Sequence, residues 1–335
     1  MPLRRLKCKS CSNFLVPWGK TQLGKKRFFC KSCGFSRTFR KKAARVNPYH
    51  LFKQYVLWGL TYQMLSSMSG YSIRFLEGHF HTYLKQDPPQ LPLVNQSGME
   101  VAYLLIDGLW FGRWFVLMVY RQSQNLVILH ISVVGREVTT KIAKDLTRLK
   151  ELGYHFTGFV SDGGTGIVGA VNKVFPNAPH QICLAHMHRD VIAAIGRYPK
   201  DPRVKELKLL ADLVWEIESK EALKYWTKLI KAWVSKHLMF LKEKRYDSEG
   251  NWWYIHRGVR KATRTLLRLP EHSFTFLNYH LMPKTTNELE ASFGHLGKRW
   301  LSHRGLKRER WQKFMKWFVY FYNQEKMAVS KQKKV

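Results

Sequence analysis

Three carboxylates stand where an acid is costly to keep without a partner. Asp107 follows an apolar run, 103–106, that predicts a buried strand; Asp162 follows a second such run, and Glu290 lies in TTNELE. A buried carboxylate is unfavourable unless it meets a metal, a donor or a counter-charge. Three converging acids can hold two divalent cations, and their oxygen ligands suit Mg²⁺ or Mn²⁺. Such a pair of ions can cleave or join phosphodiesters.

Glu290 differs from its neighbour Glu288. Thr285 and Glu288 fit a capping box, which gives Glu288 a local role at the start of a helix. Helical spacing puts Glu290 on the side of Gly294 and Gly297. Because each glycine costs a helix about 1 kcal/mol relative to alanine, the pair suggests that a sheet edge or a DNA backbone comes close. Ordinary helix–helix packing is the alternative.

The order of elements predicts that Asp107 and Asp162 meet. We expect strands at 103–107, 114–121 and 126–134, a helix at 137–152, a strand at 156–161, a helix near 166–174 and a strand near 180–184. Three antiparallel strands followed by helix, strand, helix and strand is the order of the ribonuclease-H-like fold, an α/β fold with a mixed five-stranded sheet. Its first and fourth strands are neighbours, so acids at their ends lie at one edge.

Four of the five cysteines form two CxxC pairs, Cys8 with Cys11 and Cys30 with Cys33. Four thiolates at this spacing predict one structural Zn²⁺ ion in a zinc ribbon. A redox dithiol is the alternative, but two copies on short turns disfavour it. A segment of this size needs the metal to hold a core.

Residues 49–84 predict three short helices, with Thr61 and Ser72 as caps of the second and third. Two helices joined by a short glycine-containing turn are typical of a helix-turn-helix DNA-binding unit. An ordinary three-helix packing unit is the alternative. The recognition helix would be 72–83, with Arg74 exposed.

The charge indicates a polyanionic partner. The 335 residues include 57 Lys and Arg against 23 Asp and Glu, a formal net charge of +34, and a hydrophobic content of 45% indicates a folded chain. This excess favours nucleic acid, and the chain shows no secretory signal or spanning segment. We therefore expect a cytoplasmic protein that does not bind membranes. The residues predicted to contact DNA are Arg74, Arg257, Arg260, Lys261, Lys298 and Arg299.

Composition and patterning divide the chain into segments. Tryptophans and leucines at helical spacing predict an all-helical insertion after the sheet, although 252–254 and nearby arginines are an alternative DNA groove. We expect a zinc ribbon at 1–45, a helix-turn-helix domain at 46–90, a linker at 91–99, a ribonuclease-H-like core at 100–200, the insertion at 201–280, and the glutamate helix with a basic C-terminal helix at 281–335.

Four motifs also carry a resemblance. They are LLIDG at 104–108, FVSDGGTGI at 159–167, CLAHMHRD at 183–190 and TTNELE at 285–290. In this order, with a zinc ribbon before them, they resemble bacterial insertion-sequence transposases of the Mutator-like DDE superfamily. The resemblance implies a catalytic metal-binding triad of Asp107, Asp162 and Glu290. It also implies that Cys183 and His186 form a C(2)H signature beside the active site.

Cys183 and His186 cannot complete a zinc site alone, so packing or DNA positioning is the preferred interpretation. His188 and Arg189 are predicted phosphate contacts near the active site. The resulting hypothesis is a DDE transposase that binds terminal inverted repeats, cleaves DNA ends and transfers them to target DNA, as a homodimer or larger when ends are paired. A DNA-binding regulator without catalysis and a ribonuclease-H-like nuclease or resolvase are the alternatives.

Overall fold

The computed structural model describes residues 6–22, 24, 26–38, 46–89, 103–291, 293–294 and 305–332. The predicted linker at 91–99 lies outside these residues. Within the described parts of the chain, no helix is both long and apolar enough to cross a membrane.

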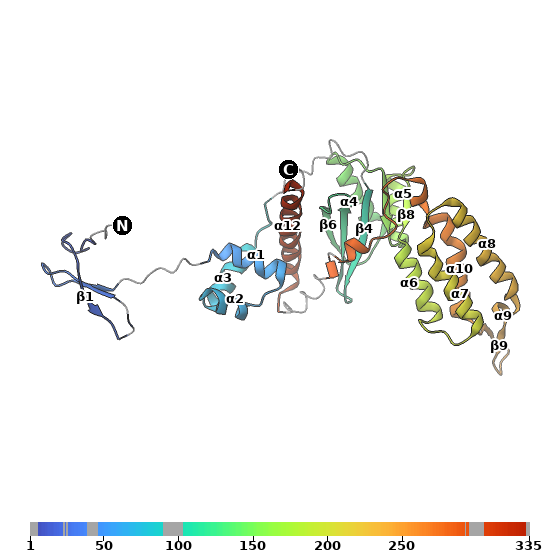
Figure 1. Ribbon diagram of the computed structural model, residues 1–335, viewed down its shortest axis with the longest axis horizontal. Helices are drawn as coiled ribbons and strands as arrows, with labels where there is room; N and C mark the ends of the chain where they lie inside the picture. Colours follow the sequence, from blue (N-terminus) through green and yellow to red (C-terminus); the bar gives the residue numbers. More distant parts are fainter. Residues whose placement is uncertain are drawn as a thin grey trace.

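A five-stranded mixed sheet forms the centre of the molecule (Figure 1). Its strands are β4 (Tyr103–Phe111), β5 (Phe115–Gln122), β6 (Ile128–Val134), β7 (Gly158–Ser161) and β8 (His180–Ile182). The order across the sheet is β6-β5-β4-β7-β8. The first three strands are antiparallel, whereas β7 is parallel to β4 and to β8. The predicted mixed sheet and the pairing of its first and fourth strands are confirmed.

The strand that carries Asp107 is longer than predicted. We expected it to end at Asp107, but β4 continues to Phe111 because β5 keeps pairing with it, with Asp107 opposite Val119. On its other side β4 pairs with β7 only as far as Ile106, opposite Ser161. Asp107 and Asp162 therefore both lie one residue beyond the last parallel pair.

Alternation along β4 divides its side chains between two cores. Leu104 and Ile106 pack with the helices α4 (Thr139–Glu151) and α5 (Thr165–Val174). Tyr103 and Leu105 join the core on the other face. Since successive strand residues point to opposite faces, Asp107 shares the face of Tyr103 and Leu105. That face also holds Leu289, from the segment that carries Glu290.

The second core joins an N-terminal three-helix unit to the sheet through the C-terminal helix. The helices are α1 (Pro48–Trp58), α2 (Tyr62–Ser69), α3 (Ile73–Tyr83) and α12 (Arg308–Gln332). The predicted caps are confirmed, because Thr61 accepts a hydrogen bond from the Met64 N–H and Ser72 from the Phe75 N–H, both at 3.3 Å. Helix α12 lies between the three helices and the sheet (Figure 1), and Trp317 donates to the Tyr83 carbonyl at 3.0 Å.

The sequence predicts an all-helical insertion, and this prediction is wrong because the insertion also contains two short strands. It contains α7 (Pro202–Asp212), η1 (Leu213–Glu216), α8 (Lys220–Lys236), α9 (Leu238–Lys242), β9 (Lys244–Tyr246), β10 (Trp252–Tyr254), α10 (Arg257–His272) and η2 (Thr275–Asn278). The hairpin β9–β10 forms because Asp247 accepts from the Glu249 and Asn251 N–H groups. Gly250 supplies the positive φ of 82° that this turn needs. The insertion has a hydrophobic core of its own, which helix α6 (Leu184–Ile195) extends toward the sheet.

The N-terminal segment is a small antiparallel sheet of β1 (Val16–Lys20), β2 (Lys26–Phe29) and β3 (Ser36–Thr38). Its buried residues are Cys8, Leu15 and Cys30. Figure 1 shows this sheet apart from the other described elements. The division of the chain into domains stays a prediction.

Candidate active site

Asp107 is held within the sheet, where its side chain is nearly inaccessible to solvent. The residue is 5% exposed, and its Oδ1 accepts a hydrogen bond from the Gly108 N–H at 2.8 Å. Burial raises the pKa of Asp107 to about 7; His186 opposes that rise and the charge of Asp162 adds to it. Keeping an ionised carboxyl group at this position therefore costs free energy of folding.

Asp162 lies on the turn between β7 and α5. Its Oδ1 accepts from the Gly164 N–H at 2.9 Å, and Gly163 adopts a φ of 85° that a side chain would strain. The carboxylate stands just before the first turn of α5, where the N-terminal end of a helix favours negative charge. The two glycines after Asp162 therefore shape the turn that presents it.

Glu290 comes from a helical segment far along the chain, which the structure describes at 287–291 and 293–294. The Thr285 hydroxyl accepts a hydrogen bond from the Asn287 N–H at 3.4 Å, and the Thr286 carbonyl accepts from the Glu290 N–H at 3.1 Å, so both threonines support the start of the segment. Glu288 forms an ion pair with the buried Arg121 of β5, at 2.9 Å. This ion pair ties the segment to the sheet, while the reciprocal contact that a capping box requires of Glu288 stays a prediction.

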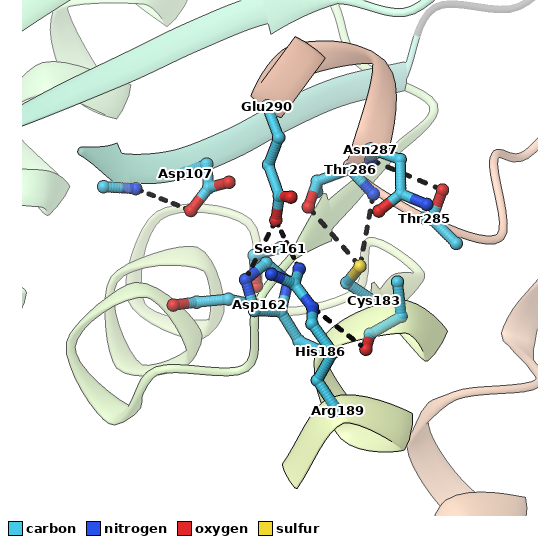
Figure 2. A network of polar contacts seen from close by, with 12 residues as sticks. Asp107, Ser161, Asp162, Cys183, His186, Arg189, Thr285, Thr286, Asn287 and Glu290 are labelled. Carbon is cyan, nitrogen blue, oxygen red and sulfur yellow. Dashed lines mark hydrogen bonds and ion pairs between the residues drawn. The ribbon is translucent and has the colours of Figure 1, made fainter. Parts of the chain in front are cut away.

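Side chains from β4, from the glutamate segment and from α6 converge at one place. The ligand atoms of Asp107, His186 and Glu290 all lie within 4.8 Å of one another. Figure 2 shows Glu290 directed down toward His186 and Arg189, with Asp107 beside it and Asp162 below. His186 Nε2 is 3.2 Å from Glu290 Oε1, and the Arg189 guanidinium contacts the same oxygen. His186 and Arg189 therefore fix the direction of the Glu290 carboxylate.

Asp162 is not within that three-residue group, although its charge contributes to the pKa of Asp107. The Cys183 thiol and, more weakly, the Asp107 carboxylate raise the pKa of His186 against the effect of burial. A protonated His186 is suited to hold the Glu290 carboxylate.

Cys183 anchors the segment that carries Glu290. The residue is fully buried before the first turn of α6. Its sulfur accepts from the Thr286 N–H at 3.2 Å and lies 3.4 Å from the Thr286 hydroxyl (Figure 2). These contacts support the packing interpretation of the CxxH pair: Cys183 positions the glutamate segment, while His186 reaches its carboxylate.

The remaining predicted site residues are dispersed. His188 Nε2 lies 2.9 Å from Asp212 Oδ1, so it joins α6 to α7. Arg260 donates to the Leu241 carbonyl and stacks on Tyr254 at 3.5 Å from its ring centre. Exposed side chains are found at Arg74, Arg257 and Lys261, and the predicted DNA contacts Lys298 and Arg299 lie outside the described residues.

Two residues that the motifs did not indicate also belong to this region. Arg121 is fully buried and pairs with Glu288; a charged residue inside an otherwise apolar strand was the available signal. Glu137 lies just before α4, and burial, followed by the charge of Asp162, raises its pKa. Acids near helix N-termini are common, so the sequence does not set Glu137 apart.

The four N-terminal cysteines form a second cluster. All four sulfurs lie within 4.8 Å of one another, with 3.6 Å between Cys8 and Cys33 and 3.4 Å between Cys11 and Cys30. A tetrahedral ion with bonds of about 2.3 Å to sulfur has sulfur–sulfur separations of about 3.8 Å. The cluster therefore has nearly the dimensions of a four-thiolate metal site.

Comparison with known proteins shows a likeness to one family. Residues 123–247 match the family described as "Transposase, Mutator family". The matched residues include Asp162, Cys183 and His186, whereas Asp107 and Glu290 lie outside them. The predicted resemblance to Mutator-family transposases is thereby confirmed, while the variant with an N-terminal zinc ribbon is not separately tested.

A particular relative is the transposase for insertion sequence element ISRM5 of Rhizobium meliloti (strain 1021). The chain is 29% identical to it over 245 residues, which are 72% of this chain and 53% of that protein. This chain therefore spans about half the length of the curated relative that it matches.

Proposed function

We propose that this chain is a DDE transposase that cleaves DNA ends and joins them to target DNA, with Asp107, Asp162 and Glu290 as its catalytic acids. The observation that carries the proposal is the meeting of Asp107 and Glu290, which are distant in the sequence, beside the end of β7 where Asp162 stands. The strand order supports a ribonuclease-H-like core. The family match and the name of the relative support transposition as the reaction.

The donor set fits divalent cations. Asp107 is buried with a raised pKa and faces a second carboxylate, an arrangement that a cation stabilises. The three acids would hold two Mg²⁺ or Mn²⁺ ions, which suit oxygen ligands. When bound, such ions activate a water or a 3′-hydroxyl and stabilise the leaving oxygen of a phosphodiester.

The chain's own side chains prepare this site. His186 and Arg189 hold the Glu290 carboxylate in place, and Cys183 fixes the start of its helical segment through Thr286. Arg189 is half-exposed, so once Glu290 binds a cation its guanidinium is placed to contact a DNA phosphate. The chain supplies positioning and charge, and the cations supply the Lewis acid.

The N-terminal elements would select the DNA. The four-cysteine cluster fits one structural Zn²⁺ ion, and α2 and α3, joined by a short turn with Gly70, fit a helix-turn-helix. We propose that the two units bind the terminal inverted repeats, and that pairing two ends requires at least a homodimer. Acting on DNA, the protein would work in the cytoplasm, at the nucleoid.

The test is strand transfer on an oligonucleotide that carries the inverted repeats flanking the gene, with Mg²⁺. Wild type is expected to form joined product, and Asp107→Ala, Asp162→Ala and Glu290→Ala are each expected to lose about a thousandfold in rate, equivalent to ~4 kcal/mol. Retained activity in all three variants would refute the assignment. Nicked ends without joined product would instead identify a nuclease or resolvase.

A further inference from the structure

The side chain of Glu137 fills the space left by the glycines that follow the two sheet acids. Gly108 follows Asp107, and a Cβ atom there would lie 2.0 Å from Glu137 Oε1 and 3.1 Å from Val116 Cγ1. Real Cβ atoms do not come this close to an oxygen. Glycine at position 108 therefore leaves room for the Glu137 carboxylate in the place that it occupies, and a side chain there would make the carboxylate move.

The same carboxylate reaches the turn that presents Asp162. A Cβ atom at Gly164 would lie 3.2 Å from Asp162 Oδ1 and 3.4 Å from Glu137 Oε2, so oxygens of both acids flank one point. At Gly166 a Cβ atom would lie 2.6 Å from the Glu137 carbonyl oxygen. The glycines of FVSDGGTGI thus let α5 approach Glu137 and bring it to Asp162.

Glu137 Oε1 is buried and has no hydrogen-bond partner within the described parts of the chain. Buried carboxylate oxygens are normally paired, because the loss of water is otherwise uncompensated. The Trp110 side chain hydrogen-bonds to the Glu137 carboxyl group, but on its other side lies a second carboxylate, Asp162, which repels Glu137 unless a cation lies between them. A divalent cation that binds oxygen ligands would compensate the negative charge of both carboxylates if it lay between Glu137 and Asp162.

Glu137 comes to the site from the face opposite Glu290. Its neighbour Val116 packs with Leu104 and Ile106 in the core beneath α4 and α5, whereas Leu289, next to Glu290, packs in the core on the other face. Because β7 ends at Ser161, no strand among the described residues continues β7 between the two faces at this point. Acids can therefore approach from both sides.

We propose that Glu137 is a fourth carboxylate of the catalytic centre and holds, together with Asp162, one of its two divalent cations. Asp107 and Glu290 then serve the other cation. The inference rests on the proposed function, since it assigns a ligand to that metal centre.

The test is Mn²⁺ binding, measured without DNA by the electron paramagnetic resonance signal of the free ion in titrations of the full zinc-loaded chain. Wild type is expected to bind two Mn²⁺ ions, and Glu137→Gln to weaken one of them at least tenfold, the scale seen when a metal site loses a supporting group. The matched control is Glu151→Gln, the same change at the exposed far end of α4; it should bind as wild type does.

Two further variants separate the possible failures. Glu137→Asp keeps the charge but shortens the side chain, so it should bind more weakly than wild type and more tightly than Glu137→Gln, and it serves if Glu137→Gln does not fold. If both Glu137 variants bound Mn²⁺ as wild type does and Asp162→Asn lost one ion, this inference would be overturned and the metal centre would stand. Wild-type binding by Asp162→Asn, or no saturable binding by wild type, would overturn the metal centre itself and the proposed function with it.

Discussion

The four-cysteine cluster and the carboxylate site are assembled in opposite ways. The cysteines lie on two turns of one small sheet, and the consecutive residues 8–33 supply all four ligand atoms. The acids come from the middle of β4, the end of β7 and a segment beyond the insertion. A local cluster of this kind needs its ion in order to fold, whereas the distant acids are held together by large cores that form without any ion. The comparison predicts that metal loss unfolds one region and only inactivates the other.

Loss of a cysteine ligand should have the largest effect, confined to the N-terminal sheet. Cys30→Ala removes a buried ligand from a site whose zinc binding contributes about 10–16 kcal/mol in comparable small domains. We expect bound zinc to disappear and end binding to fail, while calorimetry shows the main unfolding transition unchanged. Cys183→Ser, which alters a cysteine outside the cluster, should retain one zinc per chain. A shift of the main transition in Cys30→Ala would contradict the separation.

The carboxylate site should make the stability of the fold depend on pH. Asp107 has a folded pKa of about 7, above its ordinary value of 3.8, so its contribution to stability is complete below about pH 4 and is lost as pH rises through 7. A shift of this size corresponds to at most ~4 kcal/mol. Without divalent cations, wild type should therefore be less stable at pH 8 than at pH 5 in urea unfolding, and Asp107→Asn should abolish most of that difference.

Two controls sharpen this result. Added Mg²⁺ at pH 8 should stabilise wild type but not Asp107→Asn. Asp201→Asn should leave the slope between pH 5 and 8 unchanged, because the Arg203 side chain lowers the pKa of Asp201 to about 2, so the carboxyl is ionised throughout. An unaltered slope in Asp107→Asn would mean that Asp107 is not the group that titrates.

Substitution of Cys183, the fifth cysteine, tests whether it has a structural role or takes part in metal binding as the other four are proposed to do. Cys183→Ala leaves the buried Thr286 N–H and hydroxyl without their sulfur contact, which costs about 1–3 kcal/mol. We expect lower stability in urea and slower strand transfer, with zinc content unchanged. A parallel loss of zinc would give Cys183 a metal role instead.

The smallest effect is expected for a single exposed arginine. Arg74→Ala on α3 should weaken end binding uniformly and reduce the slope of log affinity against log salt by about 1, the value for one lost phosphate contact. Arg260→Ala is the comparison, since Arg260 is engaged with Leu241 and Tyr254. It should lower stability and leave the salt slope as in wild type. An unchanged slope for Arg74→Ala would remove α3 from the DNA interface.

Local chemistry explains which predictions from the sequence are confirmed. The caps at Thr61 and Ser72 each depend on the residue three positions further along the chain, and both form as expected. The strand order follows from alternation and turn residues, and the parallel pairing of β4 with β7 follows from it. In contrast, the spacing around Glu288 gives no indication of its ion pair with the buried Arg121 on a distant strand.

The sequence by itself determined the four-cysteine spacing, the caps at Thr61 and Ser72, and the order of the sheet elements, and its motifs proposed the three acids, because each depends on neighbours along the chain or on a recognisable motif. Only the tertiary structure decided that Asp107 lies within a continuing strand, that His186 and Arg189 hold Glu290, and that Glu137 touches the glycines of two motifs. These contacts depend on which faces of the sheet are covered and where β7 ends, and no local pattern in the chain encodes either.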